Sequence, residues 1–159
     1  MELPKRKPTR LKNYDYSSTG YYFITICTYN RENILCDIVG EGLCALPLIK
    51  LTHIGETVEK SINFINANYK NAVVDKYVIM PNHIHLILKI QTGGDRTPPL
   101  QVYDIIGRLK SFTTNSHGKI LWQRSFHDHI IRGEKDYLKI WDYIDTNPQK
   151  WEDDCFYTK

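Results

Sequence analysis

The sequence predicts an α+β fold in which helices cover one face of an antiparallel sheet. Strand-like composition, rich in β-branched and aromatic residues, occurs in residues 21–29, 73–80 and 83–90. Helical spacing of apolar residues occurs in residues 51–69, 102–114 and 136–147. The order strand, helix, strand, strand, helix, strand, with a trailing helix, is typical of a split β-α-β arrangement.

The N-terminal half supplies most of the predicted sheet. Residues 21–29 (YYFITICTY) predict a central strand. Residues 31–48 have little pattern and predict a short strand pair or an excursion from the fold. The helix that follows has one apolar stripe, formed by Leu51, Ile54, Val58, Ile62, Ile65 and Tyr69. Pro81 and Asn82 predict a turn that joins the next two strands as a hairpin.

The C-terminal half begins with a loop, predicted from the Gly- and Pro-rich composition of residues 91–99. The helix over 102–114 is predicted to bury Ile105, Ile106, Leu109 and Phe112. Residues 120–122 and 130–131 predict short strands or extended segments. The last helix ends where Asn147 precedes a proline.

His83 and His85 are the candidate metal ligands. Side chains alternate between the two faces of a strand, so both histidines lie opposite the apolar side chains of Ile84, Leu86, Leu88 and Ile90. Imidazoles at neighbouring same-side positions can bind one ion. The alternative is that they are ordinary surface residues. We expect the helices to leave this face of the sheet open for a ligand.

Tyr143 is the candidate nucleophile. The buried stripe of its helix is predicted to comprise Tyr137, Ile140, Trp141 and Ile144. Tyr143 lies at the edge of that stripe, and Asn147 and Asp136 share its flank one turn after it and two turns before it. Alternatively, Tyr143 is a partly buried surface aromatic and Asn147 a helix cap.

The two groups of residues suggest metal-assisted chemistry on a phosphate. A phenol is a weak nucleophile at neutral pH because its pKa is near 10. A divalent cation that polarises the phosphate makes the attack feasible. His83 and His85 supply part of a site for Mg²⁺ or Mn²⁺, which the side-chain oxygen of Asn147 and water could complete.

Composition and charge predict one compact domain with a polyanionic partner. The chain has 159 residues, of which 42% are hydrophobic and 25% charged. Residues 1–12 hold five basic and one acidic side chain, and residues 108–135 hold six basic and two acidic, so each segment carries a net +4. The candidate phosphate contacts are Arg108, Lys110, Arg124 and Arg132. The alternative is a set of solvated surface charges.

Other features are expected to be structural. The four cysteines show no Cys-x-x-Cys spacing, as is usual for free thiols of a reducing cytoplasm. No apolar run is long enough to cross a membrane, so we expect a soluble, intracellular protein. His127 and His129 are expected to hold their loop against the last helix rather than to bind metal. Trp122 and Trp151 are expected in the core rather than in stacks with bases.

Residues 80–85 (MPNHIH) resemble the HUH motif of single-tyrosine transposases. Residues 143–151 (YIDTNPQKW) resemble the Tyr-Ile-x-x-Asn-Pro-x-x-Trp signature of the REP-associated tyrosine transposases. Residues 109–112 and 122–132 also resemble segments of that family. The resemblance extends from about residue 21 to residue 151.

The resemblance implies a ferredoxin-like, RRM-like palm in residues 17–151, between a basic flexible arm (1–16) and a C-terminal tail (152–159). It implies a metal-dependent endonuclease and strand transferase that acts on single-stranded or hairpin DNA. Tyr143 would form a 5′-phosphotyrosine, and His83, His85 and Asn147 would hold Mg²⁺ or Mn²⁺, with no carboxylate as third ligand. The expected location is the nucleoid of a bacterial or archaeal cytoplasm.

Three alternatives remain at this point. A replication-type HUH nickase would share the chemistry, a nucleic-acid-binding module would lack it, and a phosphoesterase would activate water in place of tyrosine. Family members occur as monomers and as homodimers, and the sequence leaves both open.

Overall fold

The computed structural model describes residues 12–40, 47–91 and 101–158. In chain order the elements are β1 (Gly20–Cys27), the 3₁₀ helix η1 (Tyr29–Arg31), β2 (Cys36–Val39), β3 (Leu48–Leu51), α1 (His53–Asn68), β4 (Ala72–Ile79), β5 (His83–Ile90), α2 (Val102–His117), β6 (His127–Ile131), α3 (Glu134–Thr146) and the 3₁₀ helix η2 (Asn147–Asp153). The predicted α+β class is confirmed. Most of the expected basic arm and of the loop over 91–99 lies outside the described residues. No helix in the described ranges is long and apolar enough to cross a membrane.

The main sheet has four strands in the order β4-β5-β1-β6, and every neighbouring pair is antiparallel. β1 and β4, which α1 connects, lie on either side of β5. β5 and β6, which α2 connects, lie on either side of β1. β2 and β3 form a separate two-stranded ribbon, which agrees with the first of the two alternatives for residues 31–48. β3 extends to Leu51, however, so the prediction that Leu51 belongs to the following helix is wrong. β6 begins at His127, three residues before the predicted extended segment.

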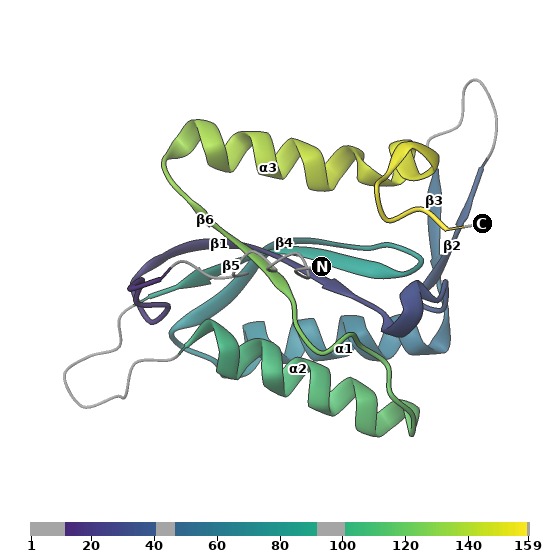
Figure 1. Ribbon diagram of the computed structural model, residues 1–159, viewed down its shortest axis with the longest axis horizontal. Coiled ribbons are helices and arrows are strands. Elements are labelled where there is room, and N and C mark those ends of the chain that lie inside the picture. The colour runs from purple at the N-terminus through teal and green to yellow at the C-terminus, as the bar shows by residue number, and fades with distance from the viewer. Residues whose placement is uncertain (1–11, 41–46, 92–100, 159) are drawn as a thin grey trace, which may run out of the picture.

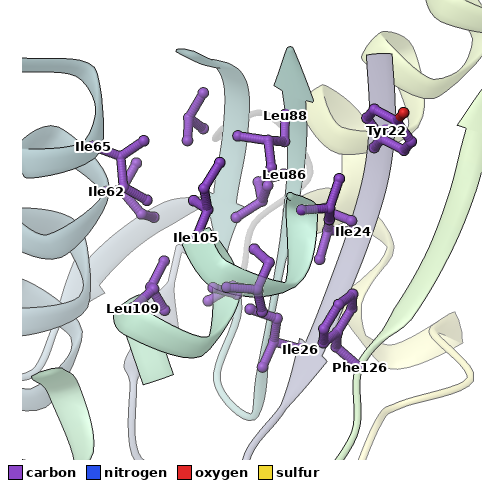
Figure 2. Packing of buried hydrophobic residues seen from close by; sticks show 14 of the residues in the cluster. Tyr22, Ile24, Ile26, Ile62, Ile65, Leu86, Leu88, Ile105, Leu109 and Phe126 are labelled. Carbon is purple, nitrogen blue, oxygen red and sulfur yellow. The ribbon is translucent and has the colours of Figure 1, made fainter. Parts of the chain in front are cut away.

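The larger core lies between the sheet and the pair α1 and α2 (Figure 1). It is built from alternate residues of the central strands and from the apolar stripes of both helices, including Tyr22, Ile24, Ile26, Leu86, Leu88, Ile62, Ile65, Ile105 and Leu109 (Figure 2). The prediction that Phe112 points inward is wrong, since its side chain is 55% exposed. Thr113, one turn beyond Leu109, occupies the inward position instead.

The opposite face of the sheet is covered by α3, which Figure 1 shows on the side away from α1 and α2. Ile140 and Ile144 of α3 belong to a second cluster with Val78, Ile87 and Ile131 of the sheet. The expectation of an open histidine face is therefore wrong. Ile87 lies on the same face as the histidines, and the apolar stripe of α3 buries that side chain.

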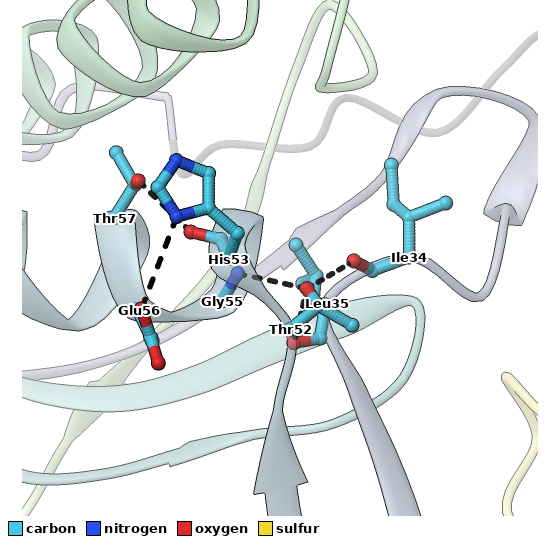
Figure 3. A network of polar contacts seen from close by, with 7 residues as sticks. All are labelled: Ile34, Leu35, Thr52, His53, Gly55, Glu56 and Thr57. Atoms are coloured by element: carbon cyan, nitrogen blue, oxygen red, sulfur yellow. Dashed lines mark hydrogen bonds and ion pairs between the residues drawn. The ribbon is translucent and has the colours of Figure 1, made fainter.

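A polar junction at the start of α1 fixes the segment that leads to β5 (Figure 3). The Thr52 hydroxyl accepts a hydrogen bond from the backbone N–H of Gly55 at 3.1 Å and lies 2.7 Å from the carbonyl oxygen of Ile34. The backbone N–H groups of Ile34 and Leu35 in turn donate to the carbonyl oxygen of Pro81. The junction thereby holds the turn that precedes His83.

Candidate active site

His83 and His85 lie at the start of β5, on the face that α3 covers. Their side chains are 0% and 1% exposed, and their ring centroids are 4.5 Å apart. Such close approach of two neutral rings follows from their same-side positions on one strand. The pair therefore forms a compact group of nitrogen donors beneath the last helix.

Two buried polar neighbours orient the imidazoles. The Asn82 side-chain oxygen lies 2.9 Å from Nδ1 of His83, and the Thr25 hydroxyl lies 2.8 Å from Nδ1 of His85. Each contact occupies Nδ1 and leaves Nε2 for another partner. Nε2 of His83 is buried and has no hydrogen-bond partner among the described residues.

Both imidazoles are neutral at pH 7. Burial lowers the pKa of His83 to about 3, with a further decrease from the positive charge of Arg31. Burial likewise lowers the pKa of His85 to about 3, and the neighbouring His83 adds to the decrease. A neutral imidazole keeps a lone pair on one nitrogen, as metal ligation requires.

Tyr143 reaches the histidine pair from α3. Its hydroxyl oxygen lies 3.4 Å from Nε2 of His85, and its side chain is 40% exposed. Burial, followed by the negative charge of Asp154, raises the pKa of the phenol to about 12, so the hydroxyl is protonated at neutral pH. Tyr137, in contrast, packs its ring on Tyr21 and lies away from the histidines, in the second cluster.

A carboxylate completes the group of possible ligands. Ligand atoms of His83, His85 and Asp154 all lie within 4.8 Å of one another. Asp154 also accepts a 2.8 Å hydrogen bond from the side-chain amide of Asn147. The expectation that no carboxylate stands near the third ligand position is wrong, because the chain turns back after η2 and brings Asp154 to the histidines.

The residues present fit a divalent cation. Nε2 of His83 and Oδ1 of Asn147 are buried without a hydrogen-bond partner among the described residues. Unpaired buried acceptors are costly, and coordination of a cation is one way to satisfy such an acceptor. Two imidazole nitrogens with an amide and a carboxylate oxygen form a mixed donor set suited to a transition-metal ion such as Mn²⁺.

The segment after η2, to which the sequence assigned no role, packs on the histidines. The ring centroids of Phe156 and His83 are 4.6 Å apart, and the Asn82 amide donates to the Phe156 carbonyl oxygen at 2.8 Å. Asn33 donates to the Thr158 carbonyl oxygen at 3.0 Å. The acidic run just after the tyrosine motif was the available signal, but its spacing does not indicate a return to β5.

Comparison with known proteins identifies the family. No protein-family model matches the chain. A Haemophilus influenzae protein named "Uncharacterized protein" is 36% identical over 173 residues, covering 96% of this chain and 93% of the relative. A "Putative REP-associated tyrosine transposase" of the same organism is 27% identical over 153 residues, covering 88% and 77%. The "REP-associated tyrosine transposase" of Escherichia coli is 35% identical over 81 residues, covering 48% and 44%.

The chain belongs to the REP-associated tyrosine transposase family.

The fold agrees with this family assignment. The "Structure of the REP associates tyrosine transposase bound to a REP hairpin" matches with a TM-score of 0.64 and 24% identity, over 89% of this chain and 73% of that one. At this identity the match shows a shared fold.

The basic residues predicted to contact DNA are not brought together. Arg108 lies on α2, where its guanidinium stacks 5.9 Å from the ring centroid of Tyr69. Lys110, also on α2, donates to the carbonyl oxygens of Gln123 and Arg124 at 2.6 and 3.0 Å. Both therefore lie across the sheet from Tyr143.

Arg124 and Arg132 are exposed on either side of β6, and their role in DNA binding stays a prediction. His129 holds β6 against α3 as expected, since its Nε2 lies 2.9 Å from Oδ2 of Asp136. Trp122 is buried in the larger core, also as expected.

Proposed function

We propose that this chain is a metal-dependent single-stranded DNA endonuclease and strand transferase that forms a covalent link through Tyr143. The observation that carries the proposal is the position of the Tyr143 hydroxyl, whose oxygen lies 3.4 Å from Nε2 of His85. Beside it, Nε2 of His83 is buried and has no hydrogen-bond partner among the described residues. A phenol beside a preformed set of cation ligands is suited to attack a phosphodiester.

His83, His85 and Asn147 would hold Mg²⁺ or Mn²⁺, with Asp154 as an additional ligand. When bound, the cation supplies positive charge that polarises a phosphate and makes the phenol more acidic. Without it the pKa of Tyr143, raised to about 12, keeps the nucleophile protonated. Thr25 and Asn82 keep the two rings oriented throughout, because their contacts use the nitrogens that face away from the site.

In the proposed reaction the Tyr143 oxygen attacks phosphorus and loses its proton to solvent. The bond from phosphorus to the 3′-oxygen breaks, and that oxygen takes up a proton to become a 3′-hydroxyl. The products are a 5′-phosphotyrosine and a free 3′-hydroxyl end. Attack of a 3′-hydroxyl on the phosphotyrosine reverses these changes, so rejoining needs no external energy.

The proposed substrate is hairpin-forming single-stranded DNA. A relative of the same fold was solved bound to a REP hairpin, which supports hairpin DNA as the ligand here. We infer that the four-stranded sheet is a ferredoxin-like palm, and the strand order β4-β5-β1-β6 supports that assignment.

A covalent-trapping assay tests the proposal. The full chain is incubated with Mn²⁺ and a labelled pool of hairpin oligonucleotides with randomised flanks, and a denaturation-resistant protein–DNA band is expected. Tyr143→Phe should abolish the band, whereas Tyr137→Phe on the same helix should retain it. His83→Ala, His85→Ala or chelation should also abolish it.

Two results would overturn the proposal. Cleavage that persists in Tyr143→Phe without any covalent band would indicate an activated water. DNA binding without cleavage under all metal conditions would indicate a binding module.

A further inference from the structure

We propose that a cavity between β1, β6 and α3 binds one unpaired nucleobase of the DNA strand, with a preference for guanine. This inference rests on the proposed function, because it assumes that single-stranded DNA lies along α3. The cavity has a volume of about 340 Å³ and is lined by Tyr21, Ile131, Gly133, Glu134 and Tyr137. A space of this size is ample for one base and too small for a base pair with its backbone.

The cavity lies within reach of a strand that contacts Tyr143. Tyr137 precedes Tyr143 by six residues on α3, which corresponds to roughly 9 Å along the helix axis. Tyr21 and Phe23 are alternate residues of β1, so they lie on one face of the sheet. The ring of Phe23 stacks on His85 with centroids 5.2 Å apart and lies edge-on to Tyr143 at 6.0 Å. A strand whose reacting phosphate is at Tyr143 therefore reaches the cavity within a few nucleotides.

Aromatic rings and a cation equip the cavity for a base. The rings of Tyr21 and Tyr137 meet edge to face with centroids 5.2 Å apart. The Lys89 ammonium lies 5.3 Å from the ring centroid of Tyr21. The Tyr137 hydroxyl donates a hydrogen bond to Asp75, which immobilises the ring. Rigid aromatic rings with a nearby cation are typical of sites that bind single-stranded nucleic acid.

Glu134 supplies the base preference. An ionised carboxylate is an acceptor with two oxygens and has no proton to donate. Guanine presents two donors side by side on its Watson–Crick edge, N1–H and N2–H, which match the two carboxylate oxygens. Thymine presents only N3–H, flanked by two carbonyl oxygens that the carboxylate repels. In an unpaired strand this edge is free, so Glu134 favours guanine over thymine.

Binding without catalysis tests the inference. Fluorescence anisotropy measures the affinity of the full chain, in the presence of a chelator, for short oligothymidylates that contain one central guanine, one hypoxanthine or thymine only. We expect the guanine oligomer to bind about tenfold more tightly than oligothymidylate. Hypoxanthine lacks the N2 amino group and should lose most of this gain.

Variants separate the cavity from general DNA affinity. Glu134→Gln should remove the guanine preference and leave the affinity for oligothymidylate unchanged or higher. Glu56→Gln, an exposed acidic residue on α1, should retain the preference. Tyr21→Ser should weaken binding to all three oligomers by several fold because it removes a stacking surface.

Equal affinities of the wild-type chain for the three oligomers, or a preference that survives in Glu134→Gln, would overturn the inference. The assay contains no metal and forms no covalent bond, so the base preference can fail while the trapping assay succeeds, and the reverse.

Discussion

The side-chain oxygen of Asn82 lies 2.9 Å from Nδ1 of His83, in a fully buried contact between neighbouring residues. The amide nitrogen of the same side chain donates to the Phe156 carbonyl oxygen at 2.8 Å, which fixes the orientation of the amide. Nδ1 of His83 therefore carries the proton, which leaves the lone pair on Nε2 available for a ligand.

We expect Asn82 to control metal affinity through this contact. Asn82→Leu should weaken Mn²⁺ binding by about 10- to 100-fold, because the ring loses its orienting partner. Asn82→Asp keeps an acceptor for Nδ1–H and loses the amide donor to Phe156, Arg31 and Thr158, none of which contacts the imidazole nitrogens, so it should bind Mn²⁺ nearly as well as the wild type. Titration monitored by the electron paramagnetic resonance signal of free Mn²⁺ gives the constants. Equal affinities of the Leu and Asp variants would contradict the expectation.

Asp154 should act as a ligand as well as a partner of Asn147. Asp154→Asn removes a negative charge from the ligand group, so Mn²⁺ affinity should fall by about tenfold or more. The same change should lower the pKa of Tyr143, since the charge of Asp154 helps to raise it. Spectrophotometric titration against the Tyr143→Phe variant isolates that pKa. Asp153→Asn, an exposed neighbour, is the matched control and should change neither quantity.

The metal-free protein should lose stability on acidification. The pKa values of His83 and His85 are lowered to about 3 in the folded chain, whereas an unfolded histidine titrates near 6.5. The unfolded state therefore binds more protons between about pH 6.5 and pH 3, and the stability present above pH 6.5 is lost as the pH falls through this range. Urea unfolding should show a decrease on the order of 4 kcal/mol between about pH 7 and pH 4.5. A His83→Gln, His85→Gln double variant should flatten this dependence.

Gly55 should be irreplaceable at the junction before α1. A Cβ atom at this position would lie 2.0 Å from the carbonyl oxygen of Leu35, so the helix start would have to move away from that segment. We expect Gly55→Ala to lower the free energy of unfolding by about 2 kcal/mol or more. Gly107→Ala is the matched control, because a Cβ atom there meets no atom within 4 Å, and it should stabilise α2 by roughly 0.5 to 1 kcal/mol. Chemical denaturation measures both.

Lys110 and Arg132 should have different roles despite their similar charge. Lys110 donates to two carbonyl oxygens before β6, so Lys110→Met should cost about 1 to 3 kcal/mol of stability. Arg132 is exposed next to α3, so Arg132→Gln should change stability by less than about 0.5 kcal/mol and weaken binding to single-stranded DNA. An equal loss of DNA affinity in the two variants at unchanged stability would contradict this division.

The sequence predicted the strands and helices well where period and length were both clear. The alternation in residues 83–90 correctly separated the two faces of β5, and the stripe of Ile140 and Ile144 is buried as predicted, although both faces of β5 proved to be covered. The position of α3 could not be predicted, because periodicity shows that a helix buries one stripe and not which face of the sheet receives it. Periodicity also leaves the edge of a stripe uncertain: Phe112 was predicted to be buried, but the neighbouring Thr113 takes the inward position.

The histidines and Tyr143 could be proposed as a group from motif and spacing, whereas Asp154 could not. Asp154 reaches the histidines only because η2 ends at Asp153 and the chain then runs back past Asn82. Such a return depends on tertiary hydrogen bonds between segments far apart in sequence. Lys110 was predicted to contact DNA because it lies in a basic segment. Its ammonium instead donates to the backbone carbonyl groups of Gln123 and Arg124, which the sequence could not indicate.

The layer that carries Tyr143 is thinner than the one beneath the sheet. Two residues of α3, Ile140 and Ile144, are buried, whereas α1 buries four side chains and α2 buries five. Local unfolding of α3 should therefore require less free energy than loss of the α1–α2 layer, and amide hydrogen exchange should be fastest in α3 among the three helices. Because Tyr143 lies on the least buried of these three helices, its helix can separate from the sheet and repack while the larger core stays folded.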